Sequence, residues 1–134
     1  MTAPPEGRLY ALPSRAVTKV SGAAAEAFLQ NLLTQDVAGL QEGLAYGCLL
    51  TPQGRFLHDV FIFREGESFC LEGEAARQEN LIRRLKMFRL RAAVTIEAGS
   101  LAVYAAHEKP DMAFSFPDPR LPALGWRGYG AAGL

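Results

Sequence analysis

Asp59 is the residue whose type and position most clearly suggest chemistry. The run 55–63 alternates as a β-strand does, which predicts that Asp59 shares one face with Leu57, Phe61 and Phe63. A carboxylate among apolar side chains has to be paired, hydrogen-bonded or used in binding. A structural carboxylate that caps a backbone group at the sheet edge is the competing interpretation.

Leu57, Arg55 and Gly54 belong to the same candidate site as Asp59. Gly54 ends a turn that begins at Thr51 and Pro52, and Arg55 follows it directly. The Arg55 guanidinium could bind a ligand carboxylate close to Asp59, although an ordinary exposed hairpin arginine fits equally well. His58 is predicted on the opposite face of the strand, so it forms no acid-base dyad with Asp59 unless a bulge turns one of them around.

One strongly basic stretch occupies 83–91 and could attract RNA or the polyglutamate tail of a folate. A solvated helix face is the favoured interpretation, because the first half of the same helix is acidic and no aromatic platform is interleaved. Nucleic-acid binding is therefore disfavoured.

The composition sets further limits on function. Lys and Arg number 14, as do Asp and Glu, so the 134-residue chain has no net charge to gather anionic partners. No apolar run is long enough to span a membrane and no secretory signal is recognisable, which predicts a cytoplasmic protein. Cys48 and Cys70 lie in apolar segments and are expected to be buried, reduced thiols rather than metal ligands.

The chain pattern predicts an α+β fold with a mostly antiparallel sheet. Strands at 8–12 and 16–20 would form a first hairpin, and strands at 44–50, 55–63 and 68–72 a meander. Helices are expected at 23–36 and 74–90, both on one side of the sheet, with further strands at 92–97 and 101–106. We expect one domain over 1–110 and a Pro- and Gly-rich connecting segment over 111–134, with one short strand near Trp126.

Four ordered blocks of the sequence resemble the YgfZ family. They cover 17–37, 48–59, 88–96 and 118–127, and the second, Cys-Leu-Leu-Thr-Pro-Gln-Gly-Arg-Phe-Leu-His-Asp, is the most diagnostic. The family's cysteine signature, Lys-Gly-Cys-x-x-Gly-Gln-Glu, is absent, so we expect the C-terminal part of the family pattern to be missing from this chain.

The resemblance implies a fold like that of the glycine-cleavage T-protein, an aminomethyltransferase, and a tetrahydrofolate site in a module of an iron-sulfur cluster assembly or repair factor. The implied partners are folate, the missing C-terminal domain and iron-sulfur client enzymes. Asp59, Leu57, Arg55 and Gly54 are the implied ligand contacts, with Asp59 the main one. An aminomethyltransferase-like enzyme is the alternative, weakened because His58 replaces the first carboxylate of the family's acidic pair.

Overall fold

The computed structural model describes residues 8–133, which form two antiparallel sheets and two main helices. The five-stranded sheet has the order β3-β4-β5-β2-β6 and the four-stranded sheet the order β1-β7-β9-β8. The strands are β1 (Tyr10–Ala11), β2 (Arg15–Ser21), β3 (Ala45–Leu50), β4 (Phe56–Glu65), β5 (Ser68–Glu74), β6 (Thr95–Ala98), β7 (Ala102–Ala106), β8 (Phe114–Pro117) and β9 (Trp126–Gly130). The predicted α+β class is confirmed, including the meander β3-β4-β5.

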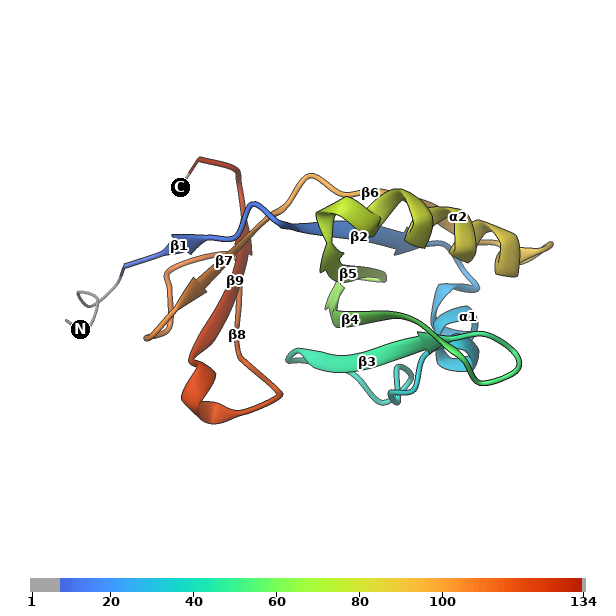
Figure 1. Cartoon of the computed structure of the whole chain (residues 1–134), viewed down its shortest axis with the longest axis horizontal. Coiled ribbons are helices and arrows are strands. Elements are labelled where there is room, and N and C mark those ends of the chain that lie inside the picture. The colour runs from blue at the N-terminus through green and yellow to red at the C-terminus, as the bar shows by residue number, and fades with distance from the viewer. Residues whose placement is uncertain (1–7, 134) are drawn as a thin grey trace.

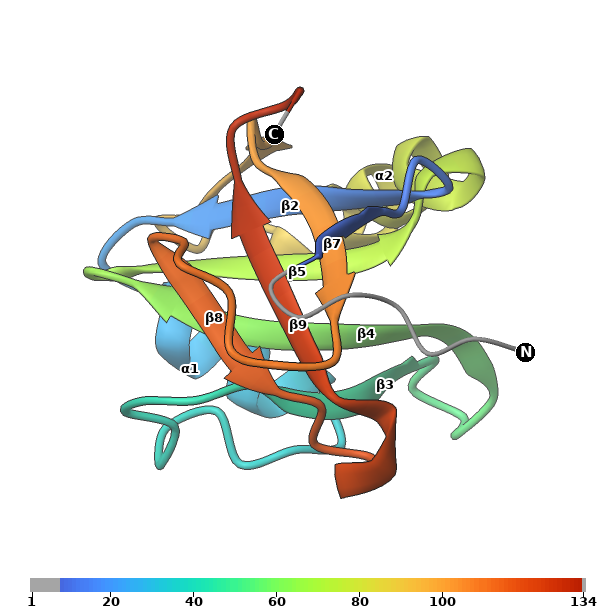
Figure 2. The same cartoon turned by 90° about the vertical axis from the view of Figure 1, so that its left-hand side faces the viewer.

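Both helices cover the same face of the five-stranded sheet, as predicted. Helix α1 (Ala25–Leu32) and helix α2 (Gln78–Arg89) share one hydrophobic cluster with β2, β4 and β5. Short 3-10 turns, η1 (Ala75–Arg77) and η2 (Pro122–Leu124), precede α2 and β9. The four-stranded sheet lies on the other side, and its strands cross those of the larger sheet steeply (Figures 1 and 2).

Strand β4 is buried on both faces, because successive side chains point to opposite faces and most of them are apolar. Val60 and Ile62 pack among the helices, whereas Phe61 and Phe63 point to the four-stranded sheet. Phe63 is fully buried, and its ring centroid lies 4.5 Å from that of Tyr129 on β9. The second sheet thus supplies the cover that the outer face of β4 requires.

The predicted first hairpin is wrong. Strand β1 pairs with β7, and β2 pairs with β5 and β6, so the two strands belong to different sheets. The turn between them is closed by the Arg15 amide, which donates to the Leu12 carbonyl at 3.0 Å. This turn carries the chain from one sheet into the other, because β1 pairs with β7 and β2 pairs with β5 and β6.

Helix α1 is shorter than predicted, and the C-terminal segment has more structure. Leu33 leaves the helix in extended conformation and bridges to Leu49, so pairing with the sheet edge replaces the last helical turn. The segment expected to be connecting chain contains β8 and β9, which pair with each other and through β9 with β7. The strand near Trp126 is confirmed as β9, whereas β8 was missed because Pro117 and its neighbours look like loop residues.

Candidate ligand site between the two sheets

Asp59 lies half-buried on the face of β4 that points to the four-stranded sheet. The Tyr46 hydroxyl donates a hydrogen bond to Asp59 Oδ2 from β3, the neighbouring strand. Within the described residues, no hydrogen bond reaches Asp59 Oδ1. This bond, then burial and the Asp59 charge, raise the pKa of Tyr46 to about 12, so Tyr46 stays a donor at neutral pH.

Strand register explains how Tyr46 reaches Asp59. Cys48 is directly opposite Asp59, and Tyr46 is directly opposite Phe61. Tyr46 and Asp59 are therefore diagonal neighbours on one face, a separation that a long aromatic side chain can span. The Tyr46 and Phe61 ring centroids are 5.0 Å apart, which holds the tyrosine beside the strand.

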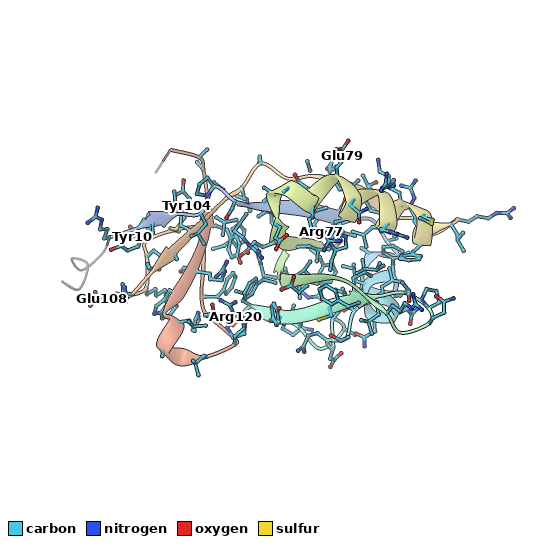
Figure 3. The ribbon with its side chains drawn as sticks, in the orientation of Figure 1. Tyr10, Arg77, Glu79, Tyr104, Glu108 and Arg120 are labelled. Carbon is cyan, nitrogen blue, oxygen red and sulfur yellow. The ribbon has the colours of Figure 1, made fainter. Side chains whose placement is uncertain are left out.

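Two arginines from the C-terminal segment close over this aromatic pair. The Arg127 Cζ lies 4.2 Å from the Phe61 ring centroid, and the Arg120 Cζ lies 4.8 Å from it. Arg120 also lies 5.9 Å from the centroid of Tyr46, at the point where the four-stranded sheet faces β3 (Figure 3). A guanidinium group over an aromatic face is attracted by the ring, and its N–H groups can still form hydrogen bonds beyond the edge of the ring.

Asp118 holds Arg120 in place. Arg120 Nε and Nη2 donate to the two oxygens of Asp118 at 3.0 and 2.8 Å. Burial alone would raise the pKa of Asp118, but the hydrogen bonds and charge of Arg120, with the more distant Arg127, together lower the pKa below its ordinary value. Asp118 is therefore ionised at neutral pH and fixes the guanidinium beside Tyr46.

Glu72 ties the two sheets together beneath this surface. Its carboxylate is fully buried and accepts bonds from Arg127 Nε at 2.8 Å, Arg127 Nη2 at 2.9 Å and the Tyr129 hydroxyl at 2.7 Å. Arg15 Nε donates a further bond at 2.5 Å. Glu72 belongs to β5 and Arg127 and Tyr129 to β9, so this ionic cluster fixes the spacing of the sheets around the Asp59 face.

The remaining predicted contacts do not gather around Asp59. Arg55 is exposed, and its amide donates to Thr51 Oγ1 at 3.0 Å within the hairpin turn. Gly54 has φ +84° and lines a groove of about 550 Å³ together with Asn31, Leu33 and Pro52. At about 3.3 Å per residue, Arg55 lies roughly 13 Å along the strand from Asp59.

Leu57 and His58 both lie on the helix side of β4. The β3-β4 register shifts between Leu49 and Leu50, and Leu57 packs against the helix-side cluster. The predicted sharing of a face by Leu57 and Asp59 is thus wrong, because the irregularity interrupts the alternation. His58 is opposite to Asp59 as predicted: it is buried, its Nε2 lies 2.8 Å from Asn80 Oδ1 on α2, and burial lowers its pKa.

Neither cysteine is in a disulfide. Burial raises the pKa of Cys70 to about 12. Cys48, directly opposite Asp59, is only half-buried, so the expectation that both thiols are buried is wrong for Cys48. In the range 8–133 no group of three or more His, Cys, Asp or Glu side chains is arranged to hold a metal ion.

Sequence reasoning missed Tyr46, Glu72, Asp118 and Arg120. Glu72 carried a usable signal, since it alternates with Phe69 and Leu71 and so falls on the face shared with Cys70. No comparable pattern marks Asp118 and Arg120, because they lie in a Pro-rich segment without a periodic spacing of apolar residues.

Comparison with known proteins identifies relatives of the chain, although no family model matches it. The iron-sulfur cluster assembly factor IBA57 homolog, mitochondrial, of Pyricularia oryzae is 35% identical over 132 residues, covering 87% of this chain and 34% of that protein. The human iron-sulfur cluster assembly factor IBA57, mitochondrial, is 29% identical over 147 residues, covering 88% of this chain and 41% of that protein. The chain is a homologue of the IBA57 iron-sulfur cluster assembly factors. The resemblance to the YgfZ family is confirmed.

A solved structure defines the fold. The glycine cleavage system aminomethyltransferase T from Bartonella henselae aligns with a TM-score of 0.65 and 23% identity, covering 72% of this chain and 27% of that chain. The T-protein type of fold is therefore confirmed. The chain itself spans about a third of the length of the Pyricularia oryzae relative, at 34%.

The relatives correct the predicted cytoplasmic location, because the IBA57 proteins matched are named mitochondrial. The sequence pattern on which that prediction rested does not distinguish the cytoplasm from another compartment. Among the described residues, no helix combines the length and apolarity needed to cross a membrane.

Proposed function

We propose that the chain forms one wall of a tetrahydrofolate site in an iron-sulfur cluster assembly factor, with Asp59 as the main folate contact. The observation that carries the proposal is the Tyr46–Asp59 pair, which holds a half-buried carboxylate on the face between the two sheets. The relatives named as assembly factors support the cellular role.

The carboxylate suits the edge of a reduced pterin. Such a ring presents an amino group and a ring N–H side by side, and a single carboxylate can accept a hydrogen bond from each. Tyr46 occupies Asp59 Oδ2 with one hydrogen bond and fixes its orientation, while Oδ1 remains an acceptor. Partial burial strengthens a charged hydrogen bond formed there.

The surrounding groups suit the rest of a folate. Arg120, which is exposed, and Tyr46, which is half-buried, offer planar surfaces beside the carboxylate. Arg55, far along the strand from Asp59, suits the glutamate carboxylates at the other end of the ligand rather than the pterin. Leu57 packs on the helix side and is no longer among the contacts we propose.

We do not extend the proposal to aminomethyl transfer. His58 bonds to Asn80 on the other side of β4, and burial lowers its pKa, so it is neutral at physiological pH. Asp59 alone then supplies negative charge at this point of the strand, whereas the transferase pattern places two carboxylates there.

Calorimetry with tetrahydrofolate tests the site. Asp59→Asn should weaken binding roughly tenfold or more, the effect of losing a charged hydrogen bond. Asp111→Asn, which changes an exposed carboxylate outside the site, is the matched control and should bind as the parent chain does. We expect the chain to bind more weakly than the longer Pyricularia oryzae relative, because a half-open site leaves its ligand solvated. Equal affinity of Asp59→Asn and the parent would contradict the proposal.

A chimera tests the assembly role separately. The chain would replace the matching third of the Pyricularia oryzae factor in cells that lack it, and the activities of iron-sulfur enzymes would be measured. We expect the chimera to restore them, and its Asp59→Asn form to restore them less. Failure of the chimera despite folate binding would refute the assembly role while leaving the ligand site intact.

A further inference from the structure

Helix α2 carries an exposed stripe that the folate site does not use. Its members, which we call the α2 stripe, are Arg83, Lys86 and Met87, which lie on one face of the helix, and Leu90, which directly follows the helix. Met87 is 53% exposed and Leu90 85% exposed, in contrast to the buried residues of the same helix. The stripe therefore combines two cations with two large apolar side chains in solvent.

The backbone at Leu90 is strained. Leu90 has φ 52° and ψ −113°, the conformation of the first central residue of a type II′ turn, which normally requires glycine. The turn is closed by the Ala92 amide, which donates to the Arg89 carbonyl at 2.9 Å. A leucine held in a glycine conformation with its side chain in water gains nothing for folding, which points to a role outside the fold.

The turn is also held by neighbouring hydrogen bonds and is prominent. Arg89 Nη1 donates to the Val94 carbonyl at 3.3 Å, and the Ala24 amide donates to the Ala93 carbonyl at 3.2 Å. The second of these bonds joins the segment after the turn to the start of α1. It forms the tip of the molecule at the end opposite the four-stranded sheet (Figure 1). The backbone that carries Leu90 is thus held in place, which lowers the entropic cost of docking.

We infer that the α2 stripe, extended by the exposed Arg91, docks an acidic amphipathic helix of a partner protein. Carboxylates on such a helix would face Arg83, Lys86 and Arg91, while its apolar residues would cover Met87 and Leu90. The chain as a whole has no net charge, so this attraction is local to the stripe. The inference goes beyond the proposed folate site and does not depend on Asp59.

A protein partner fits the stripe better than nucleic acid or membrane. Single-stranded nucleic acid binds on aromatic stacking platforms, whereas the exposed apolar members of the stripe are aliphatic. Two apolar side chains provide little of the buried area that anchors an interfacial helix in lipid.

The test measures binding of a fluorescent synthetic helix, with glutamates and leucines at helical spacing, to the 134-residue chain by anisotropy. Leu90→Gly is the decisive variant, because it relieves the backbone strain while removing the docking side chain. It should bind about tenfold more weakly than the parent, since a leucine side chain is no longer buried, yet melt at the same or a higher temperature. Arg83→Glu combined with Lys86→Glu should abolish binding, and Lys109→Glu, remote in sequence from the stripe, should not change it.

Several results would overturn the inference. One is no binding of the acidic peptide by the parent chain. Another is equal binding by the parent and Leu90→Gly. A third is tighter binding of single-stranded RNA, or of phosphatidylserine vesicles, than of the peptide. None of these results would alter the folate titration, so the two proposals fail separately.

Discussion

Replacing Glu72 by Gln should destabilise the chain strongly, because Glu72 is fully buried and joins the two sheets. Its loss leaves the Arg127 guanidinium without the carboxylate that accepts two of its bonds, at 2.8 and 2.9 Å. Breaking a buried ion pair by removing one partner costs about 3 to 5 kcal/mol. Asp118 still lies 3.6 Å from Arg127, and Arg15 keeps 18% of its side chain in solvent, so the lower end, about 3 kcal/mol, is expected.

Urea unfolding followed by circular dichroism and tryptophan fluorescence measures this effect. With a slope of about 1 to 3 kcal/mol per molar, a loss of about 3 kcal/mol lowers the midpoint by roughly 1 to 3 M. Glu65→Gln is the control, since Glu65 pairs with Lys19 at 3.0 Å on the surface, where water screens the pair, and its midpoint should hardly move. Equal midpoints for the two variants would refute the role assigned to Glu72.

A second change distinguishes lost charge pairing from lost packing. Replacing Glu72 and Arg127 together by Met removes both charges and keeps similar volumes, which often restores stability. The double variant should therefore be more stable than Glu72→Gln. If it is less stable, the bonds that Glu72 accepts from Arg15 and Tyr129, or the packing of the two side chains, matter more than the pairing of Glu72 with Arg127.

Three further predictions concern single groups. Since burial lowers the pKa of His58 in the folded state, the unfolded chain binds more protons below about pH 6.5, so stability should fall on acidification through that range; His58→Gln should flatten this part of a urea-midpoint series against pH. Cys48 should react with iodoacetamide in the native chain and Cys70 only after unfolding, because Cys70 is buried with a pKa of about 12; mass spectrometry of the labelled peptides checks this, and rapid native labelling of Cys70 would contradict it. Gly125→Ala should lower stability by about 1 kcal/mol or more, because φ is +80° and a Cβ would approach the Ala106 carbonyl oxygen to 2.5 Å; an unchanged thermal midpoint would contradict the clash.

The spacing of apolar residues along the sequence was enough to predict most helices and strands. It also predicted which face of β4 carries Phe61 and Phe63. The alternation in β4 predicted that Phe61 and Phe63 lie opposite Val60 and Ile62, and the structure confirms it. It failed at Leu57, where a register irregularity in the hairpin places this side chain with the helices. Periodicity assumes an uninterrupted ladder, and only the partner strand determines where the ladder is interrupted.

Pairing between segments far apart in the sequence determined the features that the spacing of neighbouring residues could not predict. Strand β1 is too short to choose a partner from its own residues, and it pairs with β7, far along the chain. Likewise, Asp118 and Arg120 gain a role only because β8, η2 and β9 bring them over Tyr46 and Phe61.

By itself, the sequence determined the α+β class, the two amphipathic helices, the central meander and the position of Asp59 in a buried strand. These features depend on alternation and helical spacing, which neighbouring residues specify. The tertiary structure alone decided that a second sheet covers the outer face of β4, and that Tyr46 from β3 holds the Asp59 carboxylate. It also decided that Glu72 and Arg127, separated by 55 residues, share one buried ion pair. Such contacts arise when distant segments must satisfy each other's buried charges and apolar faces, and no short stretch of sequence contains both partners.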